Sequence, residues 1–166
     1  MSDSVPSRVK EFIAGYQPDD EYHICFAWSE ELGGELNDPN ARFRRKVFKT
    51  VLRDLESAPL ILLRDLYEAE TEIARAAGGI NDGVRDLGEA LLRRGGVEFL
   101  DDFLVGKWQC FDTYMGVVVT PDAALSARLV ETLRQRLERE PESPFAELWR
   151  EGEKLFSSWL PGGEHE

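Results

Sequence analysis

The stretch of sequence that decides the fold covers residues 38–79 and reads DPNARFRRKVFKTVLRDLESAPLILLRDLYEAETEIARAAGG. Asp38-Pro39 is typical of a helix start, because aspartate caps free N–H groups and proline fits the first helical position. Apolar residues then recur every three or four positions, as the buried face of a helix requires. Pro59 opens a second such segment, and a glycine pair ends it. We therefore predict two tightly joined, antiparallel helices, 38–57 and 59–78.

The same punctuation continues toward both ends of the chain. Capping residues and prolines recur at Asn81-Asp82, Thr120-Pro121 and Ser143-Pro144, and glycines or a proline end the segments between them. The further helices that this pattern predicts are 6–16, 20–32, 82–94, 97–117, 121–140 and 144–160.

Segment 20–32 is the most ambiguous of these. Tyr22, Ile24, Phe26 and Trp28 alternate as they would in a strand, whereas other spacings in the segment fit a helix. We interpret it as a helix, because a lone strand would have no partner. The predicted fold class is all-α, a single-domain irregular bundle of about seven to eight helices over residues 1–160, with a flexible tail at 161–166.

Composition and charge limit the possible functions. The chain has 166 residues and a formal net charge of −12, and this length suits one domain. Its apolar runs, such as residues 60–63, are far shorter than the ~18 residues of a membrane span. The negative field also repels phosphate, so neither a membrane nor nucleic acid is an expected partner. With two cysteines, Cys25 and Cys110, and no export signal, we expect a cytoplasmic protein with reduced thiols.

No familiar catalytic or nucleotide-binding motif is present. The sequence lacks G-x-G-x-x-G, G-x-x-x-x-G-K-[ST], G-x-S-x-G and H-E-x-x-H. Of the two histidines, His165 lies in the tail, so His23 is the one imidazole that could act as a catalyst or ligand. We expect His23 to pack within the fold, and we expect no cofactor.

Three charged residues fall on apolar helix faces when each helix is drawn at ~100° per residue: Arg44, Glu70 and Lys107. Arg44 and Glu70 stand at equal sequence distances from the turn between their helices, so we predict a buried or partly buried ion pair. A structural polar cluster is the interpretation we prefer for all three. The alternative is a small-anion site in which Arg44 and Lys107 supply positive charge and Tyr67 or Tyr114 supplies a hydroxyl.

A basic face lies opposite the apolar face of segment 38–57. Its members are Arg42, Arg45, Lys46, Lys49 and Arg53. Such a face is usually solvated, and here it could pair with acidic residues within the fold or across a homodimer. As a binding surface it would suit phosphate groups or an acidic protein surface. We prefer a protein partner to nucleic acid because the net charge is so negative.

Acidic residues cluster on two of the predicted helices: Asp65, Glu68 and Glu72 on one, and Glu98 with Asp101 on another. Facing carboxylates can hold Mg²⁺ for diphosphate chemistry. The arrangement partly resembles the paired acidic motifs of all-α nucleoside triphosphate pyrophosphohydrolases. It departs from them because the first motif is not E-x-x-E and a predicted helix, 82–94, intervenes. Solvated acidic faces are the interpretation we prefer.

Segment 108–114 is rich in aromatic residues. Trp108 and Phe111 border the apolar face of the predicted helix, so we expect them to pack in the core. Cys110 on the same face is expected to be an inert small hydrophobic residue.

These observations favour a non-enzymatic protein–protein interaction or regulatory module, such as an adaptor, a chaperone-like binder or an immunity-type protein. The expected partner is another protein or a second copy of the chain. The first alternative is an Mg²⁺-dependent nucleotide or diphosphate hydrolase that uses the clustered carboxylates. The second is a small-anion-binding helical bundle built on the inward charges.

Overall fold

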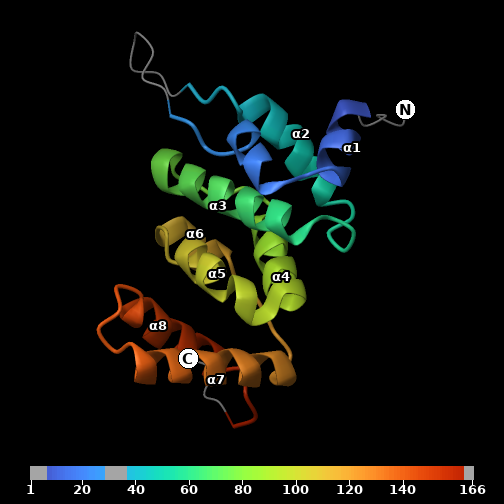
Figure 1. Ribbon diagram of the computed structural model, residues 1–166. Helices are drawn as coiled ribbons and strands as arrows, with labels where there is room; N and C mark the ends of the chain where they lie inside the picture. Colours follow the sequence, from blue (N-terminus) through green and yellow to red (C-terminus); the bar gives the residue numbers. More distant parts are fainter. Residues whose placement is uncertain (1–6, 29–36, 163–166) are drawn as a thin grey trace.

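The computed structural model describes residues 7–28 and 37–162, which form eight α-helices and two short 3₁₀ helices (Figure 1). The predicted all-α fold is confirmed. The elements, in chain order, are α1 (Ser7–Ala14), η1 (Pro18–His23), α2 (Ala41–Val51), α3 (Leu60–Ala77), α4 (Val84–Gly95), η2 (Gly96–Phe99), α5 (Leu100–Lys107), α6 (Phe111–Gly116), α7 (Ala123–Arg139) and α8 (Ala146–Ser157).

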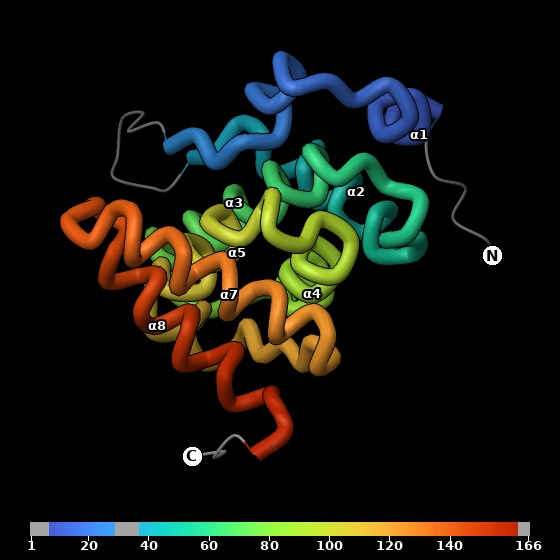
Figure 2. The backbone as a smooth tube through the Cα atoms, turned by 60° about the horizontal axis from the view of Figure 1, so that its bottom comes forward, coloured from blue at the N-terminus to red at the C-terminus, as the bar shows by residue number. Residues whose placement is uncertain are grey.

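The helices are stacked in layers that follow the order of the chain (Figure 1). α1, η1 and α2 form one end, α3 crosses beneath them, and α4, α5 and α6 form the middle. α7 and α8 pair at the other end, where they run antiparallel to each other (Figure 2). No helix in the described parts of the chain is long and apolar enough to cross a membrane.

The core is an aliphatic and aromatic cluster that runs through the middle layers. Leu62 and Leu66 on α3, Leu91 on α4 and Phe103 on α5 are completely buried, and each such side chain contributes roughly 1.5–3 kcal/mol. α5 approaches α3 closely because Gly106 has no side chain: a Cβ there would overlap the ring of Tyr67.

The predicted helix ends are confirmed only in part. α7 begins at Ala123 and not at Pro121, and its cap is Asp122 in place of the predicted Thr120: the Asp122 carboxylate accepts a hydrogen bond of 2.8 Å from the Leu125 amide. Gly78 follows α3 with φ of 75°, a value that favours glycine. Asp38, however, does not cap α2, which begins at Ala41. Its carboxylate instead accepts a hydrogen bond of 3.0 Å from the Asn40 amide in the preceding turn.

The predicted helix over 20–32 is wrong. Helical geometry ends with η1 at His23, and residues 26–28 are irregular, while residues 29–36 lie outside the described parts of the chain. The physical reason is that the backbone carbonyls just after η1 are bound by a side chain from α2. Those of Ile24 and Cys25 accept hydrogen bonds from the Arg44 guanidinium, so they do not serve a helix of their own. His23 packs as expected, in edge contact with the ring of Phe12.

The predicted helices over 97–117 and 38–57 are also corrected. The first is divided into η2, α5 and α6, with a break at residues 108–110. At the break the Thr113 hydroxyl pairs with the amide and carbonyl of Cys110, and this starts a new helix in a new direction. The second ends at Val51 and continues as turns. Of the predicted tail, residues 163–166 lie outside the described chain.

Candidate functional site

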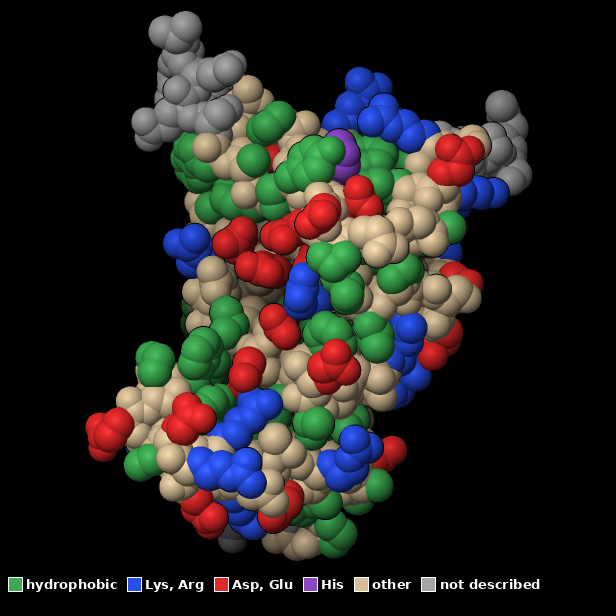
Figure 3. Space-filling model, in the orientation of Figure 1, with side chains coloured by type: hydrophobic (Ala, Val, Ile, Leu, Met, Phe, Trp, Pro, Cys, Tyr) green, Lys and Arg blue, Asp and Glu red, His purple; other side chains and the backbone are tan. Residues whose placement is uncertain are grey.

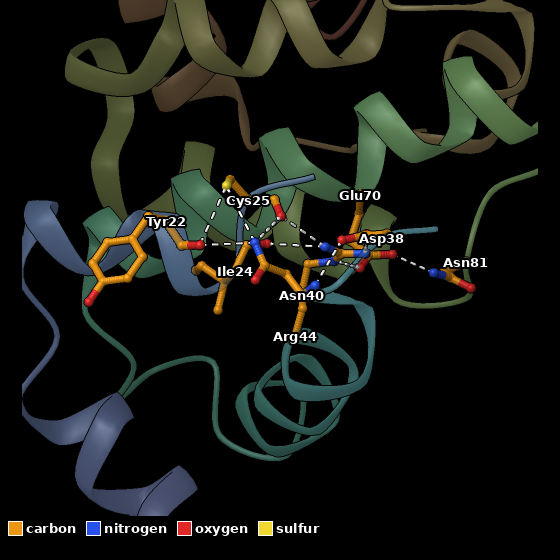
Figure 4. A network of polar contacts seen from close by, with 8 residues as sticks. All are labelled: Tyr22, Ile24, Cys25, Asp38, Asn40, Arg44, Glu70 and Asn81. Atoms are coloured by element: carbon orange, nitrogen blue, oxygen red, sulfur yellow. Dashed lines mark hydrogen bonds and ion pairs between the residues drawn. The ribbon is translucent and has the colours of Figure 1, made fainter. Parts of the chain in front are cut away.

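Arg44 is the centre of a buried polar cluster (Figure 4). Only 3% of the residue is exposed. Its Nε donates to Glu70 Oε1 at 3.3 Å, so the ion pair predicted from the sequence is present. Its Nη2 lies closer to Asp38 Oδ2, at 2.6 Å. Asp38 is therefore a second carboxylate partner, which the sequence did not reveal.

The same cluster binds backbone from a third segment. Arg44 Nη1 donates to the carbonyls of Ile24 and Cys25 at 3.3 and 3.1 Å. The Asn40 side-chain amide donates to the Cys25 carbonyl at 3.0 Å, and the Asn81 amide donates to Glu70. Each buried charge thus has several partners (Figure 4), which is the arrangement that makes a buried ion pair tolerable. We define these contacts as the Arg44 cluster, which links the segment after η1 with α2, α3 and the loop before α4.

A hollow of about 580 Å³ lies beside the Arg44 cluster. Its walls carry three cations and three carboxylates, so it is electrically balanced: Arg44, Arg45 and Lys49 against Asp38, Glu70 and Asp82. Lys107 does not line it. The structure therefore does not assemble the small-anion site that combined Arg44 with Lys107.

Lys107 is buried in a different place, with 5% of the residue exposed. Its Nζ donates to the carbonyls of Tyr114 and Val117 at 3.0 and 2.9 Å, which closes the C-terminal end of α6. The rings of Trp108 and Tyr114 lie 5.3 and 5.2 Å from the ammonium. Burial lowers the pKa of the Lys107 amine. No carboxylate of the described chain lies within ion-pair distance of it.

Lys107 lines a second hollow, which we call the Lys107 groove. Its volume is about 930 Å³, and it runs between α8 and the segment that contains α6. Tyr114 borders the groove, as expected for a residue near Lys107. Tyr67 lies elsewhere, completely buried, and its hydroxyl donates to the Phe103 carbonyl at 3.1 Å. Burial raises the pKa of Tyr67 far above its usual range.

The expectation that the aromatic segment packs in the core is only half correct. Trp108 is partly buried against the core, whereas Phe111 is 74% exposed. Tyr114, Met115 and Val118 are exposed as well. The break at residues 108–110 turns α6 away from the face that a continuous helix would have buried. The segment therefore presents apolar side chains to solvent, a feature that often marks a binding surface.

The predicted basic face is present, and all five of its side chains are exposed: Arg42, Arg45, Lys46 and Lys49 on α2, and Arg53 in the turn that follows Val51. We call these five residues the basic face of α2. None of them forms an ion pair with any residue in 7–28 or 37–162. By contrast, the Arg93 and Arg134 side chains on later helices each lie against a glutamate. In Figure 3, Lys and Arg side chains lie at the α1 end and also at the α7–α8 end, whereas Asp and Glu side chains form a band over α3.

The acidic residues proposed as Mg²⁺ ligands are only partly brought together. Glu68, Glu72 and Asp101 line one hollow of about 230 Å³ between α3 and α5. Glu98 is exposed elsewhere, and the buried Asp65 carboxylate accepts a hydrogen bond of 2.6 Å from the Tyr16 hydroxyl.

Two observations describe the chemistry of this acidic hollow. Asp101 accepts hydrogen bonds from Arg136 at 2.5 Å and from the indole of Trp149 at 2.8 Å. Burial, reinforced by neighbouring carboxylates, raises the pKa of Glu68, and burial raises the pKa of Asp102. Within residues 7–28 and 37–162, no group of three or more His, Cys, Asp or Glu side chains is placed to hold a metal ion.

Comparison with known proteins gives no relative. No protein family, no curated protein and no solved structure matches the chain. The functional argument therefore rests on the surfaces described above.

Proposed function

We propose that the protein is a non-enzymatic protein–protein interaction module, and that the basic face of α2 binds a short acidic segment of a partner protein. The observation that carries this proposal is a set of five exposed cations, four on one side of α2 and Arg53 in the turn after it. None of them forms an ion pair with a described residue, and the chain has a net charge of −12. Guanidinium and ammonium groups form their strongest hydrogen bonds with anionic oxygens.

The length of the basic face favours a short segment. α2 has 11 residues, so it extends over about 16 Å, enough for a few successive carboxylates. A nucleic-acid duplex would extend beyond the helix, and the net charge of −12 would repel its phosphates. A short acidic segment lies in direct contact with the cations of the basic face, well within the Debye length of about 8–10 Å. Most of the protein's negative charges are farther away than this, so salt screens their repulsion more than it screens the contact.

The location proposed for this module is the cytoplasm. Cys25 and Cys110 are both free thiols in the structure, a state that reducing compartments maintain. No metal or other cofactor is part of the proposal.

The direct test is fluorescence anisotropy with a labelled peptide of about twelve residues, alternating Glu and Ser, which is long enough to follow α2. The test variant carries Arg42→Glu, Lys46→Glu and Lys49→Glu. We expect it to bind the peptide at least about tenfold more weakly than the unmodified protein, and we expect the affinity of the unmodified protein to fall as salt rises.

A matched control separates the basic face from net charge. Arg75→Glu, Arg85→Glu and Arg139→Glu change three exposed arginines that form no ion pair with the described chain, so the total charge changes by the same amount. We expect this variant to bind the peptide nearly as well as the unmodified protein. Equal losses in both variants would refute the proposal. Tighter binding of a short DNA duplex than of the peptide would replace the proposal with a nucleic-acid site. If the unmodified protein self-associates and only the test variant loses this, the partner of the basic face is a second copy of the chain.

A further inference from the structure

The Lys107 groove has the dimensions and the lining of a small-molecule site. Its volume of about 930 Å³ is near the top of the ~300–1,000 Å³ range of ligand pockets. Apolar and aromatic side chains form most of its wall, among them Trp108, Met115, Val118 and Leu155. Met115 and Val118 are exposed to solvent, so the groove is open to a ligand on that side.

The groove also contains a cation for which residues 7–28 and 37–162 supply no counter-ion. Lys107 is more than nine-tenths buried, and its Nζ contacts two neutral carbonyls and two ring faces. Glu151 also lines the groove, but its carboxylate lies 2.6 Å from the ammonium of Lys154. An ammonium group has three N–H donors, and the two carbonyls take two of them.

We propose that the Lys107 groove binds a small amphipathic carboxylate, with the carboxylate on Nζ of Lys107 and the apolar body along Met115, Val118 and Leu155. The anionic group supplies the charge that the buried ammonium lacks, and desolvated opposite charges attract strongly. Each CH₂ group that leaves water contributes about 0.8 kcal/mol, so a chain of roughly eight carbons is a suitable size. This site is independent of the basic face of α2 and does not rest on the proposed function.

The experiment compares three probes with the same apolar body: octanoate, 1-octanol and octyltrimethylammonium. Binding is followed by isothermal titration calorimetry and by tryptophan emission, because Trp108 and Trp159 line the groove. We expect octanoate to bind at least about tenfold more tightly than 1-octanol, a charge-dependent preference, and octyltrimethylammonium to bind most weakly.

Two lysine variants assign the preference to one side chain. Lys107→Met is expected to remove the preference for octanoate over 1-octanol, because the apolar groove remains but its cation is lost. The matched control is the double variant Glu151→Gln, Lys154→Met: it also removes a lysine from the groove wall, and it removes that lysine's carboxylate partner so that no unpaired carboxylate is left in the groove. We expect this double variant to keep the preference.

A further variant covers the case in which Lys107→Met fails to fold, since Lys107 also closes α6. Met115→Glu changes an exposed side chain and places a competing carboxylate at the groove, so it is expected to weaken octanoate binding while circular dichroism stays unchanged. Equal affinities for octanoate and 1-octanol in the unmodified protein would overturn the proposal. So would the absence of octanoate binding at millimolar concentration, or octanoate binding that Met115→Glu leaves unaltered.

Discussion

Replacing Arg44 with alanine is expected to destabilise the N-terminal layers strongly. The variant leaves two carboxylates, those of Asp38 and Glu70, with side chains only 7% and 5% exposed and without their shared cation. Breaking a buried pair in this way typically costs about 3–5 kcal/mol. Two backbone carbonyls lose their donor as well, so we expect a loss of about 4–5 kcal/mol in the free energy of unfolding.

The assay is urea denaturation followed by circular dichroism, with the slope of the transition compared between variants to check for two-state behaviour. A loss of this size corresponds to a melting temperature lower by roughly 8–20 °C in a chain of this length. Arg45→Ala is the control, because Arg45 neighbours Arg44 but is exposed and has no ion pair with the described chain. It should cost less than about 0.5 kcal/mol.

Compensating substitutions test how the energy is divided. If Glu70 were the sole carboxylate partner, combining Arg44→Met with Glu70→Leu would restore most of the stability. Because Asp38 is closer to the guanidinium than Glu70 is, we expect the double variant to recover about half of the loss and the addition of Asp38→Asn to recover more. A double variant that is as stable as the unmodified protein would show that Asp38 contributes nothing.

The pH dependence of Arg44→Ala has a definite sign. Buried carboxylates without a cation have a higher pKa in the folded state than in the unfolded state, so the folded variant takes up protons first as the pH falls. Stability lost at neutral pH is therefore partly regained between about pH 7 and pH 5. If the difference between Arg44→Ala and the unmodified protein is below about 1 kcal/mol at neutral pH, or widens on acidification, the buried-cluster reasoning is refuted.

Three further predictions concern other contacts of the fold. Gly106→Ala should destabilise the protein by about 1–3 kcal/mol in urea denaturation, because the new methyl group overlaps the Tyr67 ring. Alanine stabilises a helix where it has free space, so a stabilised variant would contradict the close packing of α5 on α3. Asp101→Asn keeps the shape of the side chain but weakens its bonds to α7 and α8, so a loss of about 1–2 kcal/mol is expected, and no measurable loss would show that these contacts are incidental. Burial and the hydrogen bond to Asp65 raise the pKa of Tyr16 well above its usual range, and burial does the same for Tyr67. Both phenols keep their protons in the folded protein but lose them in the unfolded chain above about pH 10, so the free energy of unfolding falls as the pH rises above this value. Their phenolate absorbance should accordingly increase together with the loss of helical circular dichroism, and ionisation of all the tyrosines before unfolding would contradict this.

The Arg44–Glu70 pair was predictable because both residues lie on regular helices, where periodicity fixes the buried face. Asp38 was not, because it precedes α2 in a turn whose direction no periodic pattern sets. The basic face was predictable for the same reason as the pair: a charged stripe opposite an apolar stripe must face solvent.

The Lys107 groove could not be predicted from periodicity. Residues 108–110 themselves contain no glycine or proline, and Gly106 before them lies within the apolar pattern, so this pattern favoured one continuous helix over 97–117. The break depends on tertiary contacts instead: Lys107 bonds to carbonyls seven and ten residues later along the chain. The position of Lys107 on an apolar helix face indicated that its ammonium is buried, but it did not indicate that backbone carbonyls are its partners.

The stacking of the layers in chain order bears on how the protein reaches its fold (Figure 1). Most elements that touch in space are close in sequence, a topology of low contact order, which is associated with fast folding. All members of the Arg44 cluster lie between Tyr22 and Asn81, so this part of the molecule can assemble while the remainder is still being synthesised. α8 follows these elements in the chain and supplies one wall of the Lys107 groove, so the proposed ligand site forms only after the Arg44 cluster and α8 have both been synthesised.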